Sequence, residues 1–182
     1  MSSIVISGDT SGAITLAAPA VAGTNTITLP ASTGTVLTTG SPQSGGVIQV
    51  VNATYGTNTS TTSGSYAATG LTASITPKFS TSKILVIASM AGTGCNAASS
   101  NPSYQIYKNG SFLAYWDNIV GTGSVNGNTT TSISYLDSPA TTSSTTYAIY
   151  WARIGSGTAY LNNYQTAIGQ TVSTITLMEV AA

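Results

Sequence analysis

No part of this chain repeats apolar residues with the spacing of a helix. No segment places them at i, i+3, i+4 and i+7 over three turns, and Glu, Lys, Arg and Gln, which favour helices, are scarce. Short alternating runs rich in Thr, Val, Ile and Tyr occur instead, separated by clusters of Gly, Asn and Ser. This pattern predicts an all-β chain.

The strand pattern is most regular after residue 44. The runs that predict strands are 47–51, 66–75, 83–90, 104–107, 112–116, 132–136, 146–151, 160–164 and 172–180. The run 66–75 predicts two short strands bent at Gly70, and the very apolar run 83–90 predicts a central buried strand. Asn109 and Gly110 predict a type I′ turn, because both residues accept a positive φ. About eight antiparallel strands with long loops favour a jelly-roll-like β-sandwich.

The first 44 residues form a separate region. Four short runs, 4–6, 13–16, 26–29 and 35–38, alternate with turn-forming clusters, and the triplet Ile-Thr-Leu recurs. The region has too few large side chains for its own core, so its strands need a partner surface. A linker rich in Gly, Ser and Pro follows at 39–46.

We therefore predict two domains. Residues 1–44 form a short β-turn-β segment that needs a partner surface, either other copies of the chain or a larger assembly, and residues 45–182 form the β-sandwich head. The alternative for the N-terminal strands is an edge hairpin folded onto the main domain.

The side chains needed for catalysis are scarce. Charged residues make up 4% of the chain, with four cations, four anions and no histidine. Without histidine neither a Ser-His-Asp nor a Cys-His set can form, and a single cysteine, Cys95, provides no zinc site. The four acids are not spaced as a catalytic pair. The sequence predicts no enzymatic activity, no metal and no cofactor.

The few acids and the cysteine have structural interpretations. Asp9 and Asp137 are predicted to be turn residues. Glu179 shares a face of the last strand with Ile175 and Leu177, which predicts either a strand-end position or a pairing with Arg153 or Lys83 at a subunit contact. Cys95 is predicted to be a small buried residue.

Net charge and hydropathy restrict the partners. The formal net charge is zero, so nothing steers the chain toward nucleic acid or anionic lipid. No apolar stretch approaches the roughly 18 residues that cross a membrane. The N-terminus lacks the basic and apolar regions of a signal peptide. We expect synthesis in the cytoplasm and no membrane insertion.

Several segments resemble a known class of protein. The residues 6–12, 22–30 and 34–38 resemble an N-terminal module of virion structural proteins of tailed bacteriophages, especially marine ones. The second region is similar to C-terminal domains of phage fibre proteins, in the stretches 69–77, 82–86, 106–110, 136–139 and 173–180. The resemblance implies a homotrimer, an N-terminal segment fixed to the virion and a β-sandwich facing outward.

From this resemblance we expect a trimeric fibre or spike located in the virion. The chain is short and lacks the coiled-coil or β-helical shaft of long tail fibres, so tail and capsid locations both stay open. Its partners would be copies of itself, a capsid or tail protein and a host surface glycan or protein. The alternatives are a capsid decoration protein that stabilises the head and a free carbohydrate-binding module.

Two sets of residues are candidates for these contacts. The first combines aromatic rings with amide and carboxylate groups and suits a receptor or a subunit contact: Tyr104, Tyr107, Tyr115, Trp116, Asp117, Asn118, Trp151, Asn162, Asn163 and Tyr164. Strand alternation places one of Tyr115 and Trp116 in the core, and core or subunit packing is the alternative for most of the set. The candidates for virion attachment are Ile4, Ile6, Ile14, Leu16, Ile27 and Leu29.

Overall fold

All the elements that the structure describes are β-strands, as the sequence predicts. The structure is a computed structural model that describes residues 3–7, 11–17, 20–21, 23–24, 26, 31, 40, 42–116, 129–163 and 171–182. The chain divides into two units, Met1–Val36 and Leu37–Ala182. The sequence interpretation put the division after residue 44, within the linker.

The first unit contains an antiparallel hairpin of two short strands. Strand β1 (Ser3–Ser7) pairs with β2 (Ala13–Ala17), with Ile4 opposite Leu16 and Ile6 opposite Ile14. Of the two further strands expected in this region, residues 27–29 and 35–38 lie outside the described part of the chain.

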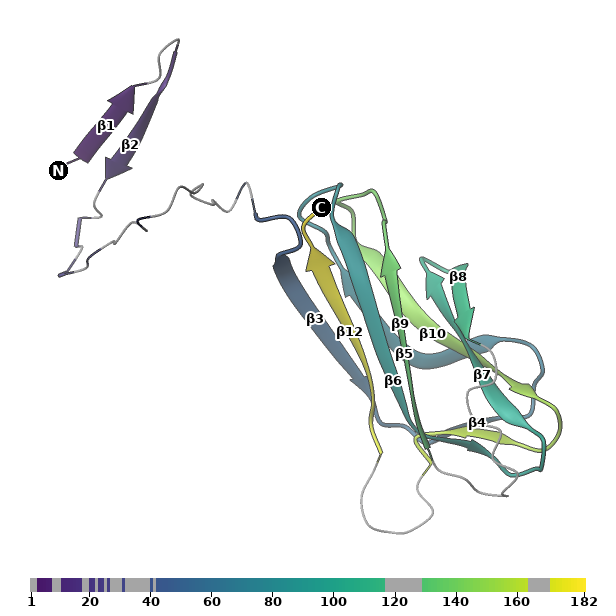
Figure 1. Ribbon diagram of the computed structural model, residues 1–182. Coiled ribbons are helices and arrows are strands. Elements are labelled where there is room, and N and C mark those ends of the chain that lie inside the picture. The colour runs from purple at the N-terminus through teal and green to yellow at the C-terminus, as the bar shows by residue number, and fades with distance from the viewer. Residues whose placement is uncertain are drawn as a thin grey trace. The chain divides into compact units, whose positions relative to one another are not determined.

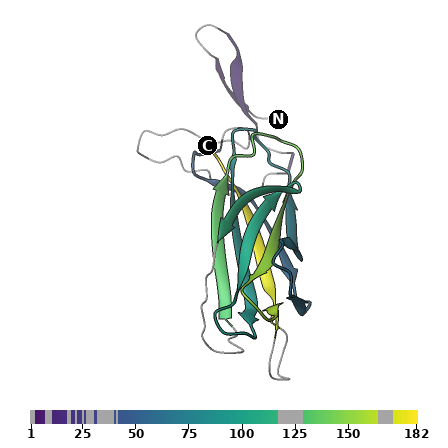
Figure 2. The ribbon, with the colours of Figure 1, turned by 90° about the vertical axis from the view of Figure 1, so that its right-hand side faces the viewer.

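The second unit is an antiparallel β-sandwich. Its described strands are β3 (Val47–Tyr55), β4 (Thr59–Thr61), β5 (Ala67–Ile75), β6 (Lys83–Cys95), β7 (Asn101–Lys108), β8 (Ser111–Trp116), β9 (Thr129–Asp137), β10 (Thr145–Ile154), β11 (Ala159–Leu161) and β12 (Ser173–Val180). One sheet has the order β5-β10-β7-β8. The other has the order β3-β12-β6-β11-β4, and β9 pairs with the remaining edge of β6. The two layers are visible in Figures 1 and 2.

The core lies between the two sheets, and strand alternation explains which residues fill it. Along β12 every second residue is buried, and β5 and β6 follow the same rule over most of their length. Strand β6 lies between β12 and β9, so the prediction of a central strand is confirmed. The core includes Trp151, and the largest of its apolar side chains that are less than 2% exposed are Tyr104, Tyr147, Leu71, Ile84, Met90, Ile106, Ile149, Leu161, Ile175 and Leu177.

Strand β5 is continuous, so the prediction of two short strands bent at Gly70 is wrong. Pairing with β10 continues on both sides of this glycine, and the register shifts opposite it, between Ala148 and Tyr150. Gly70 has a φ of 98°, and a Cβ atom there would lie 2.6 Å from the ring of Tyr55. The glycine thus permits a local irregularity in one strand and a close approach of the opposite sheet.

The hairpin of β7 and β8 forms as its turn residues predict. Asn109 and Gly110 have φ values of 49° and 79°, and the strands pair on both sides of them. The side chain of Asn109 also accepts a hydrogen bond from the backbone N–H of Thr146 at 2.8 Å. This bond fixes the turn to the neighbouring strand β10.

The linker and the last residues of the chain meet at one end of the sandwich. The backbone N–H of Gly45 donates to the carbonyl of Ala181 at 2.8 Å, and the N–H of Ala181 donates to Gly46 at 2.9 Å. Strand β3 begins and β12 ends here, as Figure 1 shows. We call this the linker end.

Candidate functional site

Four aromatic residues lie on the outer side of the sheet β5-β10-β7-β8. Tyr107 and Tyr150 alternate with buried neighbours such as Ile106 and Ile149, which point into the core. Phe112 stands opposite Tyr107 in register, and Tyr115 stands opposite Gln105. We call Tyr107, Phe112, Tyr115 and Tyr150 the aromatic face.

Three of these rings contact one another. The rings of Tyr107 and Tyr150 are stacked, with centroids 3.8 Å apart and planes 15° apart. Phe112 meets Tyr107 edge-on, at 6.1 Å and 80°. Phe112 is 53% exposed and Tyr115 is 61% exposed. The face therefore presents both flat and edge-on aromatic surface to solvent.

Among the described residues, the surroundings of the aromatic face are polar but uncharged. On the same side of the sheet, Ser74 and Thr146 share a hydrogen bond of 2.7 Å, and the hydroxyl of Thr72 donates to the carbonyl of Tyr147 at 3.0 Å. Lys108 belongs to this sheet, but its amine bonds to Asp137 of the opposite sheet. Aromatic rings beside neutral hydrogen-bonding groups suit a neutral ligand such as a sugar ring.

Two of the predicted contact residues lie inside the core. Tyr104 and Trp151 are buried, with their rings stacked 6.4 Å apart. The Tyr104 hydroxyl is hydrogen-bonded to that of Thr93, and burial raises the pKa of Tyr104 above its usual range. These two residues have no surface with which to meet a receptor, because the packing of both sheets covers them.

The neighbouring aromatic pair divides as strand alternation predicts. Tyr115 is exposed, whereas Trp116 is half-buried against the core and meets Tyr135 edge-on at 6.3 Å. Asp117, Asn118 and Tyr164 lie outside the described residues.

Asn162 holds loops together rather than facing solvent. It is buried and has a φ of 54°. Its amide donates to the carbonyls of Tyr55 and Thr57, at 2.8 and 3.1 Å, and its oxygen accepts from the Ser173 hydroxyl at 2.7 Å. Its full set of partners explains its burial. Asn163, which is half-buried, accepts a hydrogen bond from the Asn58 amide at 3.3 Å.

Asp137 is not the simple turn residue that the sequence predicts. It ends β9 and pairs with Lys108 at 3.0 Å, and it accepts a hydrogen bond from the Tyr147 hydroxyl at 2.6 Å. Burial and the neighbouring carboxylate raise the pKa of Tyr147 above its usual range. Since Lys108 and Tyr147 belong to the opposite sheet, this cluster joins the two layers.

Glu179 does not pair with Arg153 or Lys83, so that part of the prediction is wrong. The carboxylate is buried and accepts hydrogen bonds from the Gln49 amide at 2.6 Å and from the backbone N–H groups of Lys78 and Phe79, at 2.8 and 3.2 Å. Burial acts to raise the pKa of Glu179, but these hydrogen bonds together lower it below its usual value. Neutral donors thus replace the expected cation.

The described residues contain no group of three or more His, Cys, Asp or Glu side chains that could hold a metal ion. Cys95 is a free, buried cysteine, as predicted.

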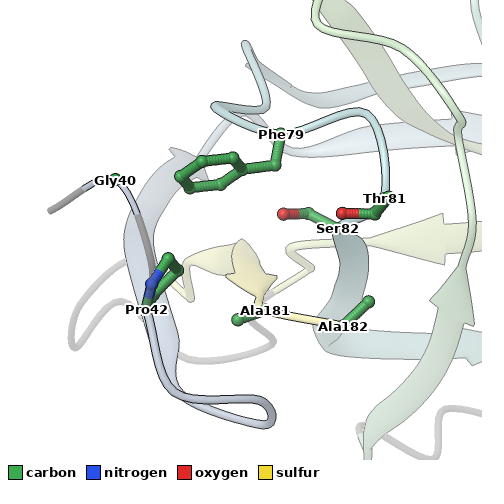
Figure 3. A pocket seen from close by; sticks show the side chains of 7 residues that line it. All are labelled: Gly40, Pro42, Phe79, Thr81, Ser82, Ala181 and Ala182. Atoms are coloured by element: carbon green, nitrogen blue, oxygen red, sulfur yellow. The ribbon is translucent and has the colours of Figure 1, made fainter. Parts of the chain in front are cut away.

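A shallow pocket of about 180 Å³ opens at the linker end, lined in part by Pro42, Phe79 and Ser82 (Figure 3). The pocket is smaller than typical small-molecule sites.

The N-terminal hairpin exposes three isoleucine side chains. Ile4, Ile6 and Ile14 are 66%, 56% and 67% exposed. Leu16 stands opposite Ile4 in register, whereas Ile27 and Leu29 lie outside the described residues. A two-stranded hairpin is marginally stable by itself, so an apolar hairpin of this kind needs a partner.

Two residues of the aromatic face were missed by sequence reasoning. Tyr150 sits between two buried residues, Ile149 and Trp151, and alternation along β10 could have placed it outward. Phe112 was recognised only as part of a strand. Its contact with Tyr107 across the hairpin depends on the register shift between Ile106 and Tyr107, for which the sequence carries no evident signal.

The sequence matches no protein-family model, and no curated protein matches it.

Proposed function

We propose that this chain is a structural protein of a tailed bacteriophage particle, a trimeric fibre or spike. In this proposal the N-terminal hairpin attaches the protein to a capsid or tail protein, and the β-sandwich is a head that contacts the host surface. The exposed apolar hairpin carries the proposal. Three isoleucines more than half exposed on a two-stranded sheet favour insertion into a partner surface.

The strand order of the head supports the same proposal. Strand β4 extends the sheet beyond the end of β3, and β11 extends it beyond the end of β12. We therefore count β3 with β4 as one strand line of the sandwich, and β11 with β12 as another. Numbered along the chain, the eight lines then form one sheet with the order 1-8-3-6 and another with the order 2-7-4-5. We interpret this order as a jelly roll, an architecture common among viral capsid and lectin domains. This support is by analogy, since one fold serves many functions.

The described residues include no helix long and apolar enough to cross a membrane.

The hairpin can be tested in assembled particles. Ile4→Asp combined with Ile6→Asp places charges on one face of β1, whereas Thr15→Asp, on β2 opposite Val5, is the matched control. We expect particles grown with the double variant to lose the protein and particles grown with the control to retain it, as measured by mass spectrometry of purified virions. Retention of the double variant, or absence of the wild-type chain from virions, would contradict the proposal.

The aromatic face favours a second candidate, a free carbohydrate-binding module. Immunogold labelling of virions distinguishes the possibilities. Label on the tail supports a tail fibre, and label on the capsid supports a capsid fibre or decoration protein. Unlabelled virions together with glycan binding by the purified protein would favour the free module.

A further inference from the structure

A row of apolar side chains crosses the outer face of the sheet that contains β3, β12, β6 and β9. Val50 stands opposite Met178, Met178 stands opposite Leu85, and Leu85 stands opposite Leu136. These four residues come from four different strands that lie side by side in Figure 1. The row therefore spans the full width of the sheet near the linker end.

The row faces away from the core. On β12 the alternate residues Ile175, Leu177 and Glu179 are fully buried, so Met178 and Val180 lie on the opposite side. Val50 is 55% exposed and Leu136 is 51% exposed. We call Val47, Val50, Leu85, Leu136, Met178 and Val180 the apolar band.

The same face becomes polar away from the linker end. Four residues along β12 from Met178, the corresponding row consists of Thr54, Thr174, Ser89 and Ser132. Both rows belong to the same strands and the same side of the sheet. The apolar character is therefore concentrated at one end of this face rather than spread over it.

We propose that the apolar band is a contact between copies of this chain. The inference rests on the proposed function in one respect, because it names the contact that holds the proposed oligomer together. The charge distribution favours a second copy as the occupant. Across the four strands the outer face carries one charged side chain, Lys83 at its edge opposite Val180, within the described residues. A surface with a single charge at its edge can meet its own copy with little like-charge repulsion.

The size of the face indicates a weak contact. The apolar band covers four strands about 4.8 Å apart and about three residues at about 3.3 Å each, which gives a flat area of roughly 190 Å². Two such bands packed together would bury about 380 Å², which is well below the standard size of a stable interface. Copies held together by their N-terminal segments would meet at a high effective concentration, which compensates for a weak contact.

Sedimentation equilibrium of the full chain tests the contact. Over about 5 to 500 µM we expect the mean mass of the wild-type protein to rise with concentration. Val50→Lys and Leu136→Lys, at opposite edges of the band, should each raise the dissociation constant at least about tenfold, because a lysine would lose its hydration in the contact. Thr54→Lys and Ser132→Lys lie on the same strands and the same face, in the polar row, and should leave association unchanged.

Thermal melting of all four variants shows that each is folded before its mass is compared. A wild-type protein that stays monomeric over this range would overturn the proposal. Band variants that associate as the wild type does, or control variants that dissociate equally, would also overturn it. None of these outcomes bears on attachment to the particle, which the incorporation of the hairpin variants into virions measures separately.

Discussion

Replacing Glu179 with glutamine should destabilise the β-sandwich at neutral pH. One carboxylate oxygen accepts a hydrogen bond from the Gln49 side chain, and the other accepts from the backbone N–H groups of Lys78 and Phe79. Gln49 also donates to the carbonyl of Thr76 at 2.7 Å. These bonds join the last strand to the segment that crosses from β5 to β6, so the carboxylate links both sheets.

The size of the effect follows from the partners. A glutamine side chain keeps one oxygen for the two backbone N–H groups, but its amide N–H₂ would face the amide of Gln49, where two donors cannot bond. One hydrogen bond to a charged group is worth about 1.5–3 kcal/mol, and the two remaining bonds weaken when their acceptor becomes neutral. We therefore expect Glu179→Gln to reduce the free energy of unfolding by about 3 kcal/mol at pH 7.

The effect should depend on pH with a definite sign. The folded protein holds the pKa of Glu179 below its usual value, so the folded state favours the ionised carboxylate. The stability that this carboxylate contributes is present above its unfolded pKa, about 4.3, and is lost as the pH falls through the lower folded pKa. The difference between the wild type and Glu179→Gln should therefore narrow below about pH 4.

Urea unfolding followed by tryptophan fluorescence measures these differences. Thr174→Gln, on the outer side of the same strand, is the matched control and should change the free energy of unfolding by less than about 0.5 kcal/mol. The reasoning is refuted if Glu179→Gln matches the wild type at pH 7 within that margin. A loss of equal size at pH 7 and in acid would show that charge is not its cause.

Two further substitutions test the links between the sheets. Tyr147→Phe removes the hydroxyl that donates to Asp137 and should cost about 1–2 kcal/mol in urea unfolding, whereas an unchanged free energy would show that this bond adds nothing to stability. Gly70→Ala should cost more than Gly110→Ala in the same assay, because both glycines have a positive φ but only at Gly70 would the new Cβ meet a ring, that of Tyr55. If both substitutions lower the free energy of unfolding by the same amount, backbone strain alone accounts for the loss and the contact with Tyr55 adds nothing.

Local sequence determined the strands and some of their turns. In β6 and β12 every second residue points to the same side of the strand, and most of these residues are apolar. This pattern can be recognised in the sequence without knowing which strands pair with β6 and β12. Asn109 and Gly110 specify their turn because their own backbones tolerate a positive φ. The candidate site was predictable to the same extent: Tyr107 and Tyr115 were identified as possible contacts, but so were Tyr104 and Trp151, which are buried.

Only the tertiary structure decided which strands meet and in which register. The apolar row of Val50, Met178, Leu85 and Leu136 comes from segments far apart in the chain, and the donors to Glu179 lie a hundred or more residues away from it. The alternation of apolar and polar residues in a strand predicts which side of the strand is buried, but it does not predict which strand pairs with it. Register between distant strands is selected by how well their side chains pack and pair, which is a property of the assembled core.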